Sequence, residues 1–509
     1  MTVINSNIAA LKAQANLAQN ARKLDSAMER LSSGTRINSA KDDAAGLAIS
    51  TKMTSQINGL NQAIRNANDG LSMVSTIEAS LAQTTNVLQR MRELAVQSAS
   101  DSNSVSDRQF LQAEIVQMNS ELDRIASQSR YNGLKVLDGS FTNKQLQIGA
   151  NSNETIAFNI SAADSASLGI FESKQNLLEA ATADTAAPTS AVVSDQVLTI
   201  SGSLGTADTS TLGSASTAFD YAAAINNQTA NTGVSATAVT KAMIGTYSDD
   251  GSTFSVKLKG KNTDAVTVSG TINLASDLTA MADAFNLVSS QTGVIAQLSS
   301  NKNQILLSNS DGYDIVLSDF DSSVSGGTVS VTSMAFDATA DDSVTGSNAT
   351  GATPTAATLT DAGSDSTRIY GTLDITSSKA FTIYAKTGGS SGASFVPSTS
   401  QSGDLTKMST ITVATQVGAS NAINVIDGAI AKISSMRGDL GAIASRLEKT
   451  VDALTASSTN TSAARSRILD ADYSSETTSL SKAQIIAQAS NAMLAQANQQ
   501  PQLVLALLK

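Results

Sequence analysis

The fold is decided by residues 426–454, whose sequence is IDGAIAKISSMRGDLGAIASRLEKTVDAL. Five apolar residues recur there at strict seven-residue spacing: Ile426, Ile433, Leu440, Leu447 and Leu454. A seven-residue apolar repeat is typical of helices that pack lengthwise against other helices. Three glycines lie inside the repeat, at 428, 438 and 441, although each costs a helix about 1 kcal/mol relative to alanine. They favour either a close helix–helix approach or a helix that adopts more than one packing.

Similar patterns recur toward the N-terminus. They predict helices over 1–33, 71–98 and 104–128, with a polar connection at 34–45 and a turn at Asn132-Gly133. A last helix is predicted over 476–499, ended by Pro501. Together with the five residues above, the seam of the predicted bundle consists of Val74, Leu81, Leu88, Leu111, Ile115 and Leu122.

The outermost segments, 1–33 and 476–509, are rich in Ala, Gln, Ser and Asn and carry only a narrow apolar stripe. A narrow stripe is typical of helices that pack against partners, although an ordinary intramolecular bundle also fits. We interpret these two segments as packing against partners, and 71–128 with 421–456 as an intramolecular bundle. The candidate packing residues of the termini are Ile4, Ile8, Leu11, Leu17, Leu24, Met28, Leu31, Leu480, Ile486, Met493, Leu494, Leu503, Leu507 and Leu508.

The middle of the chain differs from both ends. Residues 151–410 are rich in Ser, Thr, Ala, Gly and Asp and contain period-two patterns, such as 254–259 and 265–274, that predict strands. This block holds 10 basic and 24 acidic residues, a net charge of −14, against +3 for the rest. Packed ends with a solvated exterior fit this distribution, and so does solubility alone. Residues 338–366 approach low complexity and are predicted to form an exposed loop.

An internal repeat lies within the middle block. Ala222, Ala224, Asn226, Thr232, Gly233 and Val234 recur 60 residues later as Ala282, Ala284, Asn286, Thr292, Gly293 and Val294. A short helix followed by a strand is the predicted unit. A duplication of this kind favours modular growth of a surface over a catalytic site.

The composition excludes several classes of function. The chain contains no Cys, His or Trp, which rules out disulfides, thiol nucleophiles and thiolate or imidazole metal sites. We therefore predict no catalytic residues, metal ligands or cofactor. Net acidity with 4% aromatic residues argues against nucleic-acid binding. Residues 1–14 carry no recognisable cleavable signal, and no stretch approaches the ~20 apolar residues of a membrane-spanning helix. The expected location is cytoplasmic or reached by another export route.

Both ends resemble bacterial flagellin, the subunit of the flagellar filament. The motifs that carry the resemblance are 3–5 (VIN), 31–34 (LSSG), 36–49 (RINSAKDDAAGLAI), 66–70 (NANDG), 88–97 (LQRMRELAVQ), 464–468 (ARSRI), 470–473 (DADY), 495–498 (AQAN) and 507–508 (LL). The resemblance covers about half of the chain, in both terminal blocks, and the motifs stand in the order found in that family.

The resemblance implies an α+β fold, in which N- and C-terminal helices pair into a coiled-coil or helical-bundle core and a β-rich variable insert forms outer domains. Residues 1–38 with 470–509 would form inner filament-core helices that are disordered in the monomer. Residues 39–177 with 405–469 would form the helical bundle domain. Residues 178–404 would be the surface-exposed insert, in one or two domains, with its repeat at about 218–240 and 278–300.

The implied function is that of an extracellular structural subunit that polymerises into the flagellar filament and drives swimming. It would be exported unfolded through the flagellar type III channel, without a cleavable signal peptide, and assembled at the filament tip. A hook–filament junction protein has similar ends and is one alternative. A filament subunit whose outer block also acts as an adhesin is another, and an enzyme on a helical stalk has no supporting motif.

The resemblance also implies partners. Besides other copies of the chain, these are a flagellar export chaperone, a filament cap protein, hook–filament junction proteins and a vertebrate Toll-like receptor. The implied chaperone-binding residues are Asp472, Tyr473, Ile485, Leu494 and Leu505. The implied receptor contacts are Gln89, Arg90, Glu93, Leu94 and Glu114, which are equally interpretable as ordinary helix-surface and packing residues. Neither nucleic acid nor a membrane is an expected partner.

Overall fold

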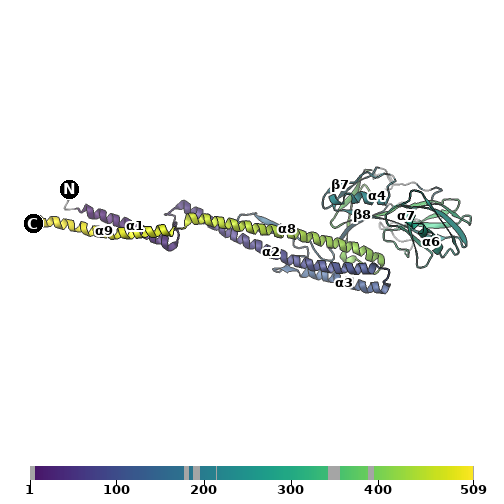
Figure 1. Ribbon diagram of the computed structural model, residues 1–509, viewed down its shortest axis with the longest axis horizontal. Coiled ribbons are helices and arrows are strands. Elements are labelled where there is room, and N and C mark those ends of the chain that lie inside the picture. The colour runs from purple at the N-terminus through teal and green to yellow at the C-terminus, as the bar shows by residue number, and fades with distance from the viewer. Residues whose placement is uncertain are drawn as a thin grey trace. The chain divides into compact units, whose positions relative to one another are not determined.

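A computed structural model describes residues 6–176, 183–186, 188, 195–213, 215–341, 356–387 and 395–507, and it confirms the α+β class (Figure 1). Its long helices are α1 (Ile8–Ser33), α2 (Ala44–Ala99), α3 (Val105–Gln128), α8 (Gln416–Leu469) and α9 (Tyr473–Leu507). All of the described strands lie between α3 and α8. The molecule divides into two compact units, one made of Met1–Thr76, Thr142–Asn159 and Leu440–Lys509, the other of Ile77–Phe141 and Ile160–Asp439.

Two helices are longer than their apolar patterns predict. The pattern over 71–98 belongs to α2, which already begins at Ala44, and the repeat over 426–454 lies within α8. The prediction that Pro501 ends the last helix is wrong, because α9 continues through it to Leu507. Proline removes one backbone donor and strains one turn, but a helix can continue when the carbonyl that loses its donor finds another.

The bundle seam lies mostly in the interior. Val74, Leu81, Leu88, Ile115, Leu122, Ile426, Ile433, Leu440 and Leu447 are buried. Leu111 and Leu454 are half-buried. Of the seam glycines, Gly428 allows a close approach of the strand β5 (Gly169–Asn176), since a Cβ there would lie 2.8 Å from the Cβ of Ile170. Nothing lies within 4 Å of a Cβ placed at Gly438 or Gly441.

The first unit contains a small hairpin beside the helices. It is formed by β3 (Lys144–Gln147) and β4 (Thr155–Phe158), which pair antiparallel. Asn66 of α2 donates from Nδ2 to the backbone oxygen of Gln147 at 2.9 Å. Gly70 lies one turn further along α2, where an added Cβ would come within 2.6 Å of Leu146. The NANDG sequence of 66–70 therefore fits α2 against this hairpin.

In the second unit, two ion pairs join α2 to α8. Arg92 lies 2.6 Å from Asp427, and Arg437 lies 2.7 Å from Glu78. A short hairpin of β1 (Arg130–Tyr131) and β2 (Leu134–Lys135) follows α3. Its turn lies at Asn132-Gly133, as the sequence predicts, and both residues adopt positive φ.

The remaining strands form three sheets in the second unit. The eight-stranded sheet has the order β11-β12-β8-β17-β5-β20, with β14 between β8 and β15. Its strands are β5 (Gly169–Asn176), β8 (Ser235–Tyr247), β11 (Ile295–Leu298), β12 (Ile305–Asn309), β14 (Thr328–Ser333), β15 (Ala356–Thr360), β17 (Thr372–Ser377) and β20 (Asp404–Lys407). Part of the predicted loop 338–366 is thus the strand β15, and the segment 342–355 lies outside the described residues.

The other two sheets have four strands each and correspond in strand order. One runs β10-β9-β13-β16, and the other, read in the corresponding direction, runs β7-β6-β18-β19. Their strands are β6 (Val197–Ser201), β7 (Thr206–Asp208), β9 (Ser252–Lys259), β10 (Val266–Ile272), β13 (Ile315–Ser322), β16 (Thr367–Ile369), β18 (Thr382–Thr387) and β19 (Gln401–Ser402).

The internal repeat is larger than the predicted helix and strand. One copy is β6-β7-α4-α5-β8, and the other is β9-β10-α6-α7-β11, with α4 (Ala218–Asn226), α5 (Thr229–Thr232), α6 (Thr279–Leu287) and α7 (Ser289–Thr292). Two strands complete each copy: β17 pairs with β8 and β18 with β6, whereas β12 pairs with β11 and β13 with β9. Because β9–β13 lie between β8 and β17 in the chain, the second copy is inserted within the first.

The repeated residues have the same structural roles in both copies. The side chain of Asn226 makes two hydrogen bonds of 2.8 Å with the backbone of Ala236, and Asn286 makes equivalent bonds of 2.8 and 2.9 Å with Ala296. Gly233 and Gly293 adopt φ values of 74° and 72°, which favour glycine after a helix end. Identity at these positions therefore follows from backbone geometry.

Candidate assembly site

The helices nearest the two chain ends, α1 and α9, lie side by side in the first unit (Figure 1). Asn7 contacts Ala497 and Asn20 contacts Ala483, so residue numbers rise along α1 as they fall along α9. The pair is therefore antiparallel. This arrangement joins the two outermost segments that the sequence assigns to packing.

The predicted packing residues divide into two groups on this pair. Leu17, Leu24, Leu31, Leu480 and Leu494 are half-buried. Ile8, Leu11, Met28, Ile486 and Met493 remain exposed, with accessible fractions of 52, 62, 53, 41 and 65%. Ile4 and Leu508 lie outside the described residues, as do the side chains of Leu503 and Leu507. Pairing of α1 with α9 thus leaves large apolar side chains open to solvent.

A groove runs along one side of the pair. Basic side chains, Arg22, Lys23 and Lys482, line it together with the small Ala483 and the apolar Ile486. The lining also includes Arg30 and Glu476, which form an ion pair across the two helices.

The chain leaves the helical conformation twice at one place in the first unit, once between α1 and α2 and once between α8 and α9. α1 ends at Ser33 and is followed by Gly34, whose φ of 68° is left-handed, and α8 ends at Leu469. The two short links then run antiparallel: the amide of Arg36 donates to the oxygen of Leu469 at 2.6 Å, and the amide of Ala471 donates to Gly34 at 3.0 Å. The Arg36 guanidinium also donates to the oxygen of Ile468 at 2.7 Å, a favourable position at a helix C-terminus.

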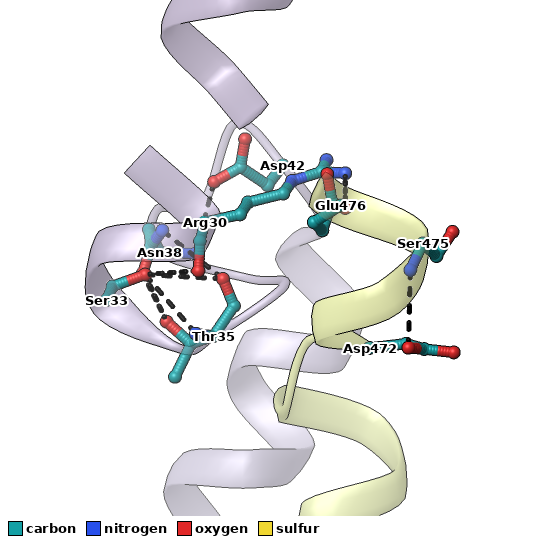
Figure 2. Close-up of polar contacts among 8 residues, drawn as sticks. All are labelled: Arg30, Ser33, Thr35, Asn38, Asp42, Asp472, Ser475 and Glu476. Atoms are coloured by element: carbon teal, nitrogen blue, oxygen red, sulfur yellow. Dashed lines mark hydrogen bonds and ion pairs between the residues drawn. The ribbon is translucent and has the colours of Figure 1, made fainter. Parts of the chain in front are cut away.

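Polar side chains hold the α1–α2 link in shape (Figure 2). Asp42 accepts hydrogen bonds from the amides of Asn38 and Ser39, and these backbone bonds lower the pKa of its carboxyl. Asp43 accepts from the amide of Gly46 at 2.8 Å and so caps the N-terminus of α2. The NSAKDDAAG sequence of 38–46 is therefore a compact turn that starts a long helix.

One ion pair spans from α1 to α9 beside these links (Figure 2). Arg30 lies 3.1 Å from Glu476, and the Glu476 side chain is only 15% exposed. Asp472 accepts from the amides of Ser474 and Ser475 and thereby caps α9. Polar contacts on both links therefore fix the joint between the α1–α9 pair and the rest of the first unit.

Other predicted site residues lie on exposed parts of their helices. Of the implied chaperone-binding residues, Tyr473 and Ile485 are 68 and 67% exposed, Asp472 is exposed and Leu494 is half-buried. The side chain of Leu505 lies outside the described residues.

The implied receptor contacts gather on α2 and α3. Arg90 lies 3.0 Å from both Glu93 and Glu114, and the hydrogen bonds that it donates to these carboxylates raise the pKa of its guanidinium. Gln89 is exposed beside them. Leu94 is 1% exposed, so its side chain supports the helix from beneath and does not itself present a surface.

Sequence reasoning missed Asn7, Asn20 and the Arg30–Glu476 pair. A signal for Asn20 exists, because it lies three residues after Leu17 and four before Leu24, at a position of the apolar stripe. A polar residue at such a position indicates a specific partner on the facing helix.

Within the described ranges, no group of three or more acidic side chains is placed to hold a metal ion. No helix there combines the length and apolar character needed to cross a membrane.

Comparison with known proteins identifies the family. Residues 4–142 match the bacterial flagellin N-terminal helical region, and residues 423–508 match the bacterial flagellin C-terminal helical region. The B-type flagellin of Pseudomonas aeruginosa is 35% identical over 506 residues, covering 99% of both chains. A flagellin of Salmonella typhimurium is 34% identical over 519 residues, covering 100% of this chain and 99% of that one.

Among solved structures, FliC from Burkholderia pseudomallei is 18% identical, covers 74% of this chain and 99% of its own, and has a TM-score of 0.29. The family assignment rests on the sequence relatives, which align from end to end and are named as flagellins rather than as junction proteins. The chain therefore belongs to the bacterial flagellins, the structural proteins that polymerise into the extracellular filament of the flagellum.

Proposed function

We propose that the α1–α9 pair forms the inner part of the filament and that chains contact one another there through the exposed apolar residues. The observation that carries this proposal is that Leu11 and Met493 stay 62 and 65% exposed after the two helices have paired. Complete burial of such a side chain contributes about 1.5–3 kcal/mol. Repeated contacts between unlike surfaces of identical chains then produce an open helix and not a closed ring.

The proposal includes the three-part division of the chain. Residues 1–38 with 470–509 form the inner part, 39–177 with 405–469 the bundle domain, and 178–404 the outer insert. The terminal pair buries little apolar surface within one chain, so the entropy lost on ordering it is offset mainly by contacts between chains. We therefore expect these segments to be disordered in the free chain and ordered in the filament.

Matched substitutions test the inner packing. Leu11→Gln and Met493→Gln should each raise the concentration needed for polymerisation about tenfold, since burial of one large apolar side chain is lost. Lys12→Gln, at the exposed neighbouring position, is the control and should assemble normally. Electron microscopy and sedimentation of salt-seeded filaments provide the measurement. Normal assembly of both apolar variants would place this surface outside the subunit contacts.

Export and chaperone binding form a second part of the proposal. We propose that the chain leaves the cell unfolded through the flagellar channel, without a cleaved signal, and that a flagellar export chaperone covers 470–509 beforehand. The exposure of Tyr473 and Ile485 supports this, because apolar groups on an unassembled segment promote aggregation. Calorimetric titration of the free chain with the chaperone should lose affinity with Ile485→Ser and keep it with the control Gln484→Ser. Unchanged affinity would move the binding site elsewhere.

Recognition by a vertebrate Toll-like receptor is a third part. We propose that the charged cluster of Arg90, Glu93 and Glu114 is the contact, together with Gln89, whereas Leu94 acts through packing. In a receptor reporter assay, Arg90→Ala should reduce the response of monomeric protein at least tenfold, with Arg124→Ala as the exposed control on α3. An equal response from the two variants would remove this cluster from the contact. The filament cap and the junction proteins are the remaining partners that we propose.

A further inference from the structure

A proline, Pro501, lies inside α9. Pro501 has no backbone N–H, so the carbonyl of Ala497, four residues earlier, lacks its usual helical donor. The side chain of Asn7 lies across from it on the paired helix, and its Nδ2 donates to the oxygen of Ala497 at 2.8 Å. Asn7 thus fills the position that the proline leaves open.

Asn7 has a second function in the same place. Its Oδ1 accepts from the amide of Ala10 at 3.0 Å, which caps the first turn of α1. The amide group is therefore oriented at one end by its own helix, and its donor is directed toward α9. This orientation makes the contact with Ala497 specific to one axial position of α1.

Asn20 makes an equivalent contact further along the pair. Its Nδ2 donates to the oxygen of Ala483 at 2.7 Å, and the side chain is 5% exposed. Because a buried amide without a partner costs about 1–3 kcal/mol, Asn20 favours alignments in which a carbonyl is within reach. Carbonyl oxygens have two lone pairs, so Ala483 can accept this bond besides its helical one.

The two contacts together define a register. They are 13 residues apart on α1 and 14 apart on α9, about 20 Å along either helix at 1.5 Å per residue. The Arg30–Glu476 ion pair lies on the same antiparallel line. A slip of one heptad would exchange the Ala483 carbonyl at Asn20 for that of residue 476 or 490, whereas the Ala497 carbonyl would lose Asn7 and Arg30 would lose Glu476.

The apolar residues of the pair cannot supply this discrimination by themselves. Much of the seam consists of alanine: Ala27 and Ala483 are buried, and Ala13 and Ala487 are half-buried. Alanine against alanine packs about equally well in several alignments, whereas a polar residue in a seam selects one.

We propose that Asn7 and Asn20, with the carbonyl opened by Pro501, form a register lock that fixes the antiparallel alignment of α1 and α9 within one chain. The lock positions the exposed apolar residues for assembly and so rests on the proposed inner packing. Its main effect is on which alignment forms, and it contributes less to how tightly the helices hold together.

Disulfide cross-linking in filaments tests the register lock. The natural chain contains no Cys, so only the introduced cysteines can form a link. By the spacing above, Ala13 faces Ser490, so the Ala13→Cys, Ser490→Cys pair reports the native register. The Ala13→Cys, Ala483→Cys and Ala13→Cys, Ala497→Cys pairs report slips of one heptad in either direction. Each pair is oxidised in filaments grown from mixed light and heavy-isotope chains, and mass spectrometry separates links within a chain from links between chains.

With Asn7 and Asn20 intact, we expect at least tenfold more of the native link than of either slipped link. In chains that also carry Asn7→Ala and Asn20→Leu, the slipped links should rise to within about threefold of the native one. Asn16→Leu, at an exposed position of α1, is the matched control and should keep the native link dominant. Native links alone in the doubly substituted chain would overturn the lock.

A double-mutant cycle tests the proline separately and does not require a slipped chain to polymerise. With Pro501 present, Asn7→Ser, which keeps the cap of α1 but cannot reach α9, should raise the critical concentration for polymerisation about fivefold, because a carbonyl loses its donor. With Pro501→Ala, residue 501 supplies an N–H to Ala497, and Asn7→Ser should then raise the critical concentration less than about twofold. Equal costs in both backgrounds would show that Asn7 acts independently of the proline.

The two proposals can fail separately. If Leu11→Gln and Met493→Gln assembled normally, the inner packing would be rejected, yet the cross-links would still report the alignment within each chain. If those variants failed to assemble while the Asn7→Ala, Asn20→Leu chain kept only the native link, the packing would stand and the lock would be rejected.

Discussion

At the scale of single residues, the short polar side chains carry more of the specificity than the apolar ones. Asp43 caps α2, Asp472 caps α9 and Asn7 caps α1, each through bonds to backbone amides. Many polar residues would keep these positions soluble, but only residues with a short side-chain hydrogen-bond acceptor cap the start of a helix well. Their positions therefore determine where the long helices begin.

One buried acid in the outer insert predicts a dependence on pH. Asp374 of β17 is 5% exposed, and within the described part of the chain its Oδ1 has no hydrogen-bond partner. Burial, reinforced by Glu172 and opposed by Lys174, raises the pKa of its carboxyl to about 6. The pKa in the unfolded chain is about 3.9. A raised folded-state pKa favours the protonated form, so stability from this group falls as pH rises from about 4 to 6 and stays low above that.

Asp374→Asn should therefore stabilise the outer insert by about 2 kcal/mol at pH 7.5 and have little effect at pH 4, because the wild-type carboxyl is then protonated. Chemical denaturation followed by circular dichroism at both pH values measures this. Asp283→Asn, an exposed acid in the same insert, is the control. An equal effect of Asp374→Asn at both pH values would mean that charge burial is not the cause.

At the scale of elements, each repeat copy contains a glycine that packs against the backbone at the end of a short helix. A Cβ at Gly202, after β6, would lie 2.0 Å from the oxygen of Thr232, and one at Gly260, after β9, would lie 2.3 Å from the oxygen of Thr292. These glycines are 58 residues apart, so the uniform offset of 60 does not include them. The equivalence of the two copies thus extends to the strand that packs on the helix pair.

Gly202→Ala and Gly260→Ala should each destabilise the outer insert by about 2–3 kcal/mol, since a backbone oxygen cannot move aside as a side chain can. Gly213→Ala is the matched control, because nothing lies within 4 Å of a Cβ there. Thermal unfolding monitored by circular dichroism gives the comparison. If all three variants melted together, the close approach would not be required by the fold.

At the scale of the whole molecule, the insert enters and leaves through neighbouring strands. β5 and β20 pair antiparallel, with Glu172 beside Asp404 and Gly169 beside Lys407. The strand positions that precede and follow the insert are therefore adjacent, as expected for a segment added to a core that can close without it. The predicted boundary at 404/405 falls inside β20, and the one at 177/178 lies outside the described residues.

Replacing residues 177–403 by a short linker should preserve filament formation, because β5 and β20 could then join as a hairpin. The filaments should be thinner, and the helical unfolding midpoint should stay within about 5 °C of the full chain, since the helix contacts of both units remain. Electron microscopy and thermal melts provide the readouts. Loss of all filaments from a chain with intact helix content would make the insert part of the assembly contacts.

Sequence patterns predicted the α+β class, most helix positions and the repeat, but not the full lengths of α2 and α8. Residues 44–70 of α2 have a diffuse apolar pattern, and packing against the β3–β4 hairpin sustains the helix there. Local sequence rules also could not predict that the helix continues through Pro501, because the compensating donor, Asn7, is 494 residues away.

The sequence by itself determined that the chain ends are helical, that the middle is a duplicated β-rich block, and that the whole belongs with flagellins. Periodicity and long motifs are local properties, and a single sequence carries them completely. Only the tertiary structure decided that α1 and α9 align antiparallel through Asn7 and Asn20, and that one repeat copy lies within the other. Those features depend on hydrogen bonds and strand pairings between residues hundreds of positions apart, which no local pattern records.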